Sequence, residues 1–401
     1  MTQQNETGEI KQKGKVLRVL GDYGFLSNEE TPGRDVYFKA QWFRGNPPLK
    51  EGDLVEYEMK TYGDNLTASS LNRLDMEGKA PPATVPVPLG VPHSPYLFEW
   101  AYLGYLPTVL SDLKGFALRE DWEFKNTPPN TDRPCPILYS YLMHTFGRLA
   151  MEKKVLVNER AGVAAFNTGL VDPRYEAIYA LFEPNNDPRA PWQLANFCNA
   201  GEGRGGQTLV RHFNPLPQTA HYFDTSVDLL YDIRASKPEL DWKHVIIERI
   251  ERYPSEFVED HWPPEFTHQD VSQMPLEGKK EYYTKLGAAI EAHSRTYRRI
   301  ISRVKDAVDL SIKRVAWNDK TAIPTYYPRV RKLQLLLPLC LVTDERVDLA
   351  LAIEKTPSGN YLGHTALPLD WAYKNARLVC RPDSDWLSPK EITAVEGEDE
   401  E

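Results

Sequence analysis

The chain has 401 residues, 41% of them hydrophobic and 26% charged, which is compatible with two or three domains of an ordinary globular protein. Because the net charge is −9, the chain is not expected to coat nucleic acid through bulk charge. Any nucleic-acid contact must use a local basic patch or base stacking. The four cysteines lack zinc-binding spacing, so we expect neither a metal nor a cofactor.

The apolar segments are too short to cross a membrane. The longest run, LQLLLPLCLV at 333–342, contains Pro338 and is about half the length of a membrane-spanning helix. The polar stretch MTQQNETGEIKQKGK lacks the apolar core of a signal peptide. We therefore expect a cytoplasmic protein with no membrane partner.

In chain order, composition predicts five segments. We expect a disordered N-terminus, a small β-barrel, a proline-rich linker, a large mixed domain and an acidic tail. Their predicted bounds are 1–13, 14–74, 75–95, 96–391 and 392–401. Five short alternating runs separated by turn-forming residues are typical of a small barrel, and the blocks of strands and helices that follow predict an α+β fold.

The barrel segment carries aromatic side chains at alternate positions. Residues two apart in a strand share a face, so Tyr23 and Phe25 lie together, as do Tyr37 and Lys39. The intervening apolar side chains fill the interior; they are Leu26, Val36 and Phe38. The pattern thus predicts a stacking platform with cations for phosphates, formed by Lys15, Arg18, Tyr23, Phe25, Tyr37 and Lys39.

This segment resembles a cold-shock domain, a five-stranded OB-type barrel that binds single-stranded RNA or DNA. The resemblance rests on GKVLRVLGDYGFLSNEETPGRDVYFKAQWF, LKEGDLVEYEM and TASSLNRL. It implies stacking roles for Tyr23, Phe25 and Tyr37 and a basic role for Lys15. The chain departs from the family pattern at three positions, where Arg18 replaces Trp, Lys39 replaces His and Ala40 replaces Phe. The other interpretation is a barrel whose rings contact protein.

The large domain is predicted to contain a helix at 139–154, strands at 155–184 and either one long helix or two joined helices at 279–316. Three strands and a short helix follow. Several segments resemble a bacterial domain of unknown function that accompanies cold-shock or LOTUS-type RNA-binding modules. They are YSYLMHTFGRL, AAFNTGLVD, KTAIPTYYPRVRKLQLLLPLCL and LDWAYKNARLVCRPDSDWL. This resemblance implies a role in RNA metabolism and supplies no catalytic residue.

Two groups in the large domain are candidate phosphate ligands. Arg160 and Asn167 lie near predicted turns, where they serve either a phosphate or turn geometry. Helical periodicity over 286–308 places four cations opposite an apolar face that includes His293; they are Arg295, Arg298, Arg299 and Arg303. This basic face tracks a nucleic-acid backbone or is a solvated surface with pairs such as Glu291–Arg295.

The remaining motifs carry less information about function. The loop NAGEGRGGQ at 199–207 contains a GxGxxG, but we expect a strand-like run after it, which argues against a dinucleotide site. His144, His212 and His364 are isolated in sequence. The sequence therefore supports a single-stranded RNA- or DNA-binding protein whose large domain is a binding or regulatory module with a possible protein partner. The alternative is an RNA- or nucleotide-processing enzyme with its active site in that domain and unknown catalytic residues.

Overall fold

The computed structural model of the chain describes residues 11–20, 23–27, 35–39, 43, 49–62, 65–74, 90–92, 94–127, 134–187, 190–271 and 273–394. It divides into two compact units, Met1–Val87 and Pro88–Glu401. Most of the expected N-terminal segment 1–13, most of the 75–95 linker and the end of the acidic tail fall outside the described residues.

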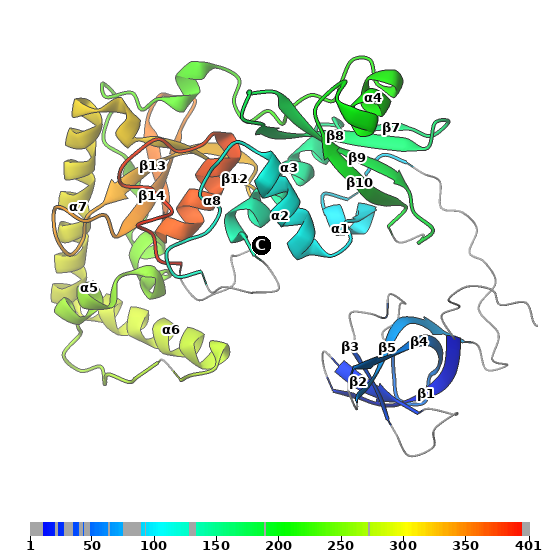
Figure 1. Ribbon diagram of the computed structural model, residues 1–401. Helices are drawn as coiled ribbons and strands as arrows, with labels where there is room; N and C mark the ends of the chain where they lie inside the picture. The colour runs from blue at the N-terminus through cyan, green and yellow to red at the C-terminus, as the bar shows by residue number, and fades with distance from the viewer. Residues whose placement is uncertain are drawn as a thin grey trace, which may run out of the picture. The chain divides into compact units, whose positions relative to one another are not determined.

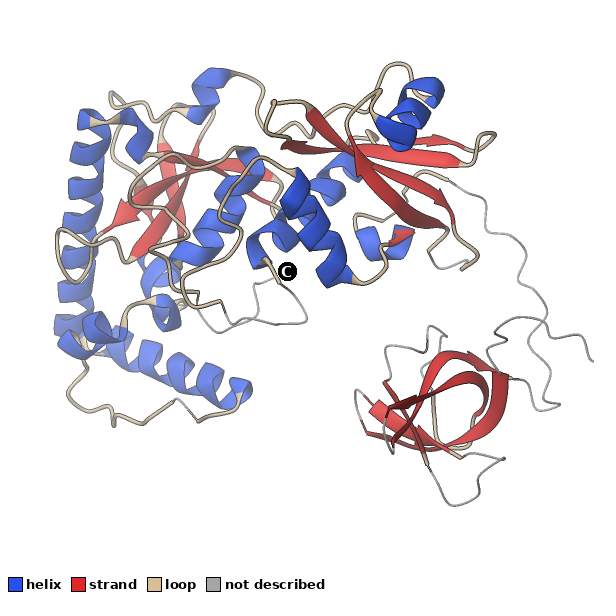
Figure 2. Cartoon of the chain, viewed as in Figure 1, coloured by secondary structure: helices blue, strands red, loops and turns tan. Residues whose placement is uncertain are grey.

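The first unit is a closed five-stranded β-barrel with strand order β1-β2-β3-β5-β4 (Figure 1). The described elements of this unit are all strands, as Figure 2 shows. They are β1 (Lys11–Leu20), β2 (Tyr23–Leu26), β3 (Val36–Lys39), β4 (Leu54–Tyr62) and β5 (Asn65–Arg73). β4 pairs with β1 to close the barrel, and β3 pairs with β5 in parallel.

The barrel interior contains the residues that the alternating sequence pattern predicted. Leu26, Val36 and Phe38 are fully buried. One boundary differs: β1 starts at Lys11, opposite Glu58, and not at residue 14. The polar residues 11–13 extend the strand because their backbone groups can pair with β4 whatever their side chains are.

The second unit contains two five-stranded sheets with helices packed on their faces, as Figure 1 shows. The first sheet has the order β6-β10-β9-β8-β7 and the second β11-β15-β14-β13-β12. Strands of the first are β6 (Ala101–Tyr102), β7 (Leu156–Asn158), β8 (Val163–Val171), β9 (Ala177–Pro184) and β10 (Trp192–Cys198). Strands of the second are β11 (Glu239–Leu240), β12 (Ile323–Tyr327), β13 (Lys332–Leu339), β14 (Leu349–Lys355) and β15 (Tyr361–Leu367).

The helices divide among three layers. The central layer holds α1 (Leu97–Trp100), α2 (Leu106–Phe116), α3 (Pro136–Met151) and α8 (Leu369–Val379). On the outer face of the first sheet lies α4 (Gly203–His212), and against the second lie α6 (Leu276–Ala292) and α7 (Ser294–Trp317). Short helices are η2 (Ser226–Leu229), η3 (Lys243–Ile247), η4 (Ile250–Arg252), α5 (Ser255–Asp260) and η5 (Asp319–Thr321).

β13 shows why its sequence reads as a continuous apolar run. Leu336 faces the central helices, whereas Leu335, Leu337 and Leu339 face α6 and α7. Both faces of this strand are therefore buried, and every position between Leu335 and Leu339 is apolar. The predicted α+β class and its strand and helix blocks are confirmed.

Of the two alternatives for residues 279–316, two joined helices are confirmed: α6 ends at Ala292, and α7 begins at Ser294. His293 lies at the junction, where its Nδ1 accepts a bond from the Thr296 N–H at 3.3 Å. It is a half-buried helix cap and does not lie in the core.

One expectation needs correction, and it concerns the glycine-rich loop. Residues 203–212 form helix α4, not a strand. A Cβ on Gly205 would lie 2.5 Å from the Asn196 side chain, and one on Gly206 would lie 2.1 Å from the Asn199 carbonyl oxygen. Close packing on β10 thus requires these glycines, which local propensity disfavours in a helix. The next strand, β11, belongs to the other sheet, so no βαβ dinucleotide unit forms.

Residues just beyond 391 still pack on the second unit. Ile392 is buried in the central core, and the Ala394 N–H donates to Asn126 Oδ1 at 2.7 Å. The folded chain therefore continues beyond residue 391.

Candidate nucleic-acid interface and basic pocket

Three aromatic rings form a contiguous outer surface on the barrel. Cross-strand pairing places Phe25 opposite Tyr37 and Tyr23 opposite Lys39. The Tyr23 and Tyr37 rings stack with centroids 5.8 Å apart, and the Phe25 ring meets each of them edge-on at 6.0 Å. Tyr23 is 40% exposed and the other two rings are half-buried. We call these three residues the aromatic triad.

A bulge in β1 brings two cations to the outside. The register shifts between Val16 and Arg18, so Leu17 is an extra residue. Without this shift, Lys15 and Arg18 would point to opposite faces, but both are exposed. The Arg18 guanidinium carbon lies 4.5 Å from the Phe25 ring centroid. A base that approaches Phe25 must displace this group or stack on its plane.

The barrel candidates therefore lie where the sequence analysis expected, with Lys39 exposed at the end of β3. The cold-shock positions Asp22 and Ala40 lie outside the described residues. Binding of nucleic acid by the triad and its cations stays a prediction.

Asn167 and Arg160 do not form a joint site. Asn167 is buried in β8, where its Nδ2 donates to the Pro217 carbonyl at 3.3 Å and its Oδ1 accepts from the Gly169 N–H at 2.9 Å. Its amide therefore holds local backbone structure. Arg160 is exposed in the turn between β7 and β8. Neither lines the large pocket described below.

The arginines of α7 divide into two kinds. Arg303 is held by the Leu341 carbonyl at 2.8 Å and by Asp344 at 3.1 Å, so it connects the helix to the turn after β13. Arg295, Arg298 and Arg299 are exposed. The expected partner of Arg295, Glu291, pairs with Lys243 at 2.8 Å. Glu291 therefore does not form the i,i+4 pair with Arg295 that the spacing suggested.

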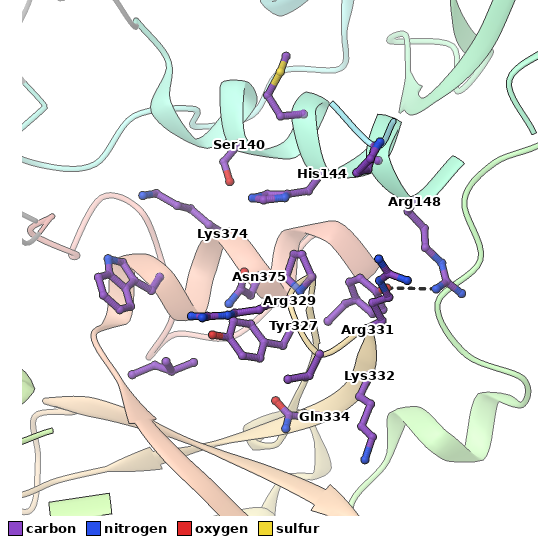
Figure 3. Close-up of a pocket in the computed structure, with 18 of the residues that line it drawn as sticks. Ser140, His144, Arg148, Tyr327, Arg329, Arg331, Lys332, Gln334, Lys374 and Asn375 are labelled. Carbon is purple, nitrogen blue, oxygen red and sulfur yellow. Dashed lines mark hydrogen bonds between the residues drawn. The ribbon is translucent and has the colours of Figure 1, made fainter. Parts of the chain in front are cut away.

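A pocket of about 1030 Å³ opens in the second unit. Its walls come from α3, α8, the β12–β13 hairpin, β14, β15, residues 95–98 and residues 244–252. Figure 3 shows Ser140, His144 and Arg148 of α3 across the cavity from Lys332 and Gln334 of β13. We call this cavity the basic pocket.

The charge of the basic pocket is strongly positive. Seven Lys/Arg residues line it, and of the described lining residues Glu354 is the sole carboxylate, which leaves an excess of six positive charges with histidine neutral. The cations are Arg148, Arg249, Arg252, Arg329, Arg331, Lys332 and Lys374. Three histidines add donors or acceptors: His144, His244 and His364. An anion is the ligand that such a lining favours.

Glu354 is engaged on both oxygens. Lys332 Nζ lies 2.7 Å from Oε1, and His364 Nε2 lies 2.9 Å from Oε2. Partial burial raises the pKa of Glu354, but the bonds from Lys332 and His364 outweigh it and hold the pKa below its ordinary value. The carboxylate is therefore ionised at neutral pH and orients the His364 ring.

Two arginines in the pocket wall are held in place by neighbouring side chains. Arg148 Nε lies 2.6 Å from Glu152, and its Nη1 donates to Tyr326 Oη at 3.1 Å. Burial lowers the pKa of Arg148, but Tyr326 and Glu152 raise it further, and the guanidinium stays charged. Arg252 lies over the Trp371 ring and donates to Thr365 Oγ1 at 3.0 Å. These bonds position the cations before any ligand arrives.

Residues 113–386 match a family model described as a domain of unknown function, DUF3825. The chain belongs to the DUF3825 family. No curated protein matches the sequence. Among solved structures, one described as Drosophila Unr CSD456 matches at 12% identity with a TM-score of 0.16. The match covers 49% of this chain and 65% of that one, slightly under two thirds of its length.

The DUF3825 region contains every described pocket residue except those at 95–98, whereas the barrel lies outside it. Most of the pocket of this chain therefore lies within the matched region. In the part of the chain that the structure describes, no helix is long and apolar enough to cross a membrane, and no group of three acidic, histidine or cysteine residues could hold a metal ion.

Sequence reasoning missed this pocket. His144 and His364 were treated as isolated because 219 positions separate them in the chain. A usable signal was present in the loop PRVRK at 328–332, which has three cations in five residues at a hairpin turn. Only the packing of α8 on β12 and α3 brings this loop to the histidines.

Proposed function

We propose that the chain binds single-stranded nucleic acid, RNA foremost, through the barrel. The supporting observation is the aromatic triad, whose rings are exposed or half-buried although the barrel core is complete without them. Rings on a β surface flanked by Lys15, Arg18 and Lys39 suit unpaired bases with their phosphates. The cold-shock resemblance of the same residues is consistent with this role.

The proposal places the protein in bacterial RNA metabolism in the cytoplasm. The barrel recruits the strand by stacking, and the DUF3825 domain is a second binding module or a regulatory one. The exposed arginines of α7 extend the binding surface along a phosphate backbone. The competing role for the triad is contact with a protein. In that role the protein, and not RNA, covers the same rings.

The test compares single-stranded and duplex RNA. Binding of a fluorescein-labelled oligoribonucleotide of about 12 nucleotides is measured by anisotropy, alone and annealed to its complement. Stacking on the triad requires unpaired bases, so we expect at least tenfold tighter binding of the single strand. The same strand as DNA shows whether the sugar matters. Equal affinity for both RNA forms, or none for either, would contradict the proposal.

A processing enzyme is the second candidate, and one observation favours it. In the basic pocket His364 is oriented by Glu354, and a second histidine, His144, lies on α3. A histidine with a carboxylate partner among cations has the arrangement of a general base for phosphoryl chemistry. Its test is incubation of end-labelled RNA with the chain and with His364→Ala. An unchanged substrate, by denaturing gel and intact mass, argues against this candidate.

A further inference from the structure

We propose that the basic pocket of the DUF3825 domain binds a nucleoside phosphate, with cations on the phosphate and aromatic rings of the pocket entrance on the base. The inference does not depend on nucleic-acid binding by the barrel, because every residue that carries it belongs to the second unit. Four independent features of the pocket support it.

The first feature is an amide at the cavity wall without a protein partner. Gln334 lines the pocket and is only 6% exposed. Its carboxamide makes no hydrogen bond to any of the described residues. Neither amide atom is among the fully buried polar atoms that lack a partner, so both keep some exposure to the cavity. They are therefore open to a ligand with both donors and acceptors, such as a phosphate or a base edge.

The second feature is the conformation of Arg331. This residue occupies the left-handed region at φ 58 in the turn between β12 and β13. Such a conformation is uncommon for a side chain other than Gly, Asn or Asp. The Arg331 N–H donates to the Tyr327 carbonyl at 2.8 Å, which closes the turn. The guanidinium makes no ion pair or hydrogen bond to another described residue, so it is available to an anion.

The third feature is the charge of the pocket lining as a whole. Three of its cations have acidic partners: Lys332 pairs with Glu354, Arg148 with Glu152 and Arg252 with Glu251. The described lining nevertheless holds seven cations and one carboxylate, in a chain whose net charge is −9. Clustered cations repel one another, and an anionic ligand relieves this repulsion. A phosphate group offers the acceptor oxygens that several guanidinium groups can share.

The fourth feature is the pocket entrance. Tyr96 and Phe98 line the pocket, yet they are 67% and 47% exposed. Two large aromatic side chains side by side with a cationic cavity match the two parts of a nucleotide, a flat base and a charged phosphate. The volume of about 1030 Å³ lies at the upper end of the range that binds small ligands, so it admits a nucleotide with part of a neighbour.

A nucleoside phosphate reaches the pocket from two sources, as a free nucleotide or as the phosphorylated end of a strand. Isothermal titration calorimetry distinguishes them. The full chain carrying Tyr23→Ala and Tyr37→Ala, which lacks the two proposed stacking tyrosines of the barrel, is titrated with adenosine, with adenosine 5′-monophosphate and with short oligoribonucleotides. The oligomers carry a phosphate at the 5′ end, at the 3′ end or at neither end.

We expect adenosine 5′-monophosphate, or an oligomer with a terminal phosphate, to bind at least tenfold tighter than its phosphate-free counterpart. Two variants remove pocket groups without harming the fold. Arg331→Gly suits the positive φ, and Gln334→Leu removes a buried amide at nearly constant volume. Each should weaken binding about tenfold or more, whereas Arg331→Lys should retain part of it. Arg119→Ala, an exposed arginine outside the pocket, is the control and should leave affinity unchanged.

Two outcomes would overturn the inference. One is the absence of any phosphate-dependent binding by the nucleotide and by both phosphorylated oligomers. The other is phosphate-dependent binding that both Arg331→Gly and Gln334→Leu leave intact, because the ligand would then occupy a different site. Failure of the barrel variants to lose RNA affinity would refute the barrel proposal without affecting this one.

Discussion

Replacement of Tyr23 and Tyr37 by alanine tests the stacking surface at its exposed rings. Base–aromatic stacking contributes roughly 1–3 kcal/mol per ring. Two rings thus contribute about 2–6 kcal/mol, and since 1.4 kcal/mol is a factor of ten, the lower limit corresponds to a loss of about 30-fold in affinity. The rings contact each other at 5.8 Å, so their effects should be coupled and the double variant is more informative than either single one.

The fold should survive these changes. Tyr23 is 40% exposed, and neither tyrosine belongs to the cluster of buried residues in the barrel core. Affinity is measured by anisotropy with single-stranded RNA at fixed salt, and thermal melting by circular dichroism checks the fold. Tyr105→Ala, which truncates an exposed tyrosine of the second unit, is the matched control. A loss of less than threefold in the double variant, with an unchanged melting curve, would refute stacking on the triad.

Three further predictions address the second unit. Arg298→Glu with Arg299→Glu should reduce the slope of log affinity against log salt by about 1.4, since each single-strand phosphate contact contributes about 0.7; an unaltered slope would mean that α7 does not contact phosphates. Glu120→Gln should destabilise the unit by about 3–5 kcal/mol in urea unfolding, because it leaves Arg377 buried without its partner. A cost below 1 kcal/mol would show that the pair is solvated. Burial raises the pKa of Cys198 to about 11, so its thiol should resist iodoacetamide at pH 8 and react only in the unfolded chain, as mass spectrometry of peptides can show.

The barrel could be predicted because the alternating sequence pattern that specifies each of its strands is local. Alternation assigned Leu26, Val36 and Phe38 to the interior, and a closed barrel has one interior to fill. The bulge at Leu17 was not predictable, because a register shift depends on the partner strand. It nonetheless decides that Lys15 and Arg18 share the outer surface.

The second unit was predictable in its elements and not in its site. Apolar runs located β13, β14 and β15, but glycines at 205 and 206 concealed α4, since their packing against β10 outweighs their poor helix propensity. The break at His293 was ambiguous, because the periodicity of α7 continues that of α6 by chance. The pocket needed the tertiary structure, because segments between residues 95 and 375 supply its walls.

The distribution of charge limits how the basic pocket can act. When its six excess positive charges are set aside, the rest of the chain carries −15. At 0.1 M salt the Debye length is about 10 Å, so a phosphate inside the pocket experiences mainly the lining cations, while phosphates farther out meet a chain whose remaining charge is net negative. Higher salt weakens the local attraction but also screens repulsion by this negative charge. The affinity for a mononucleotide should therefore fall with salt in proportion to the number of phosphate contacts in the pocket. The affinity for a long strand should fall less steeply for each phosphate contact. Measurement of this difference would support a pocket that selects one phosphorylated nucleotide, and equal salt dependence per contact would support one that tracks a backbone.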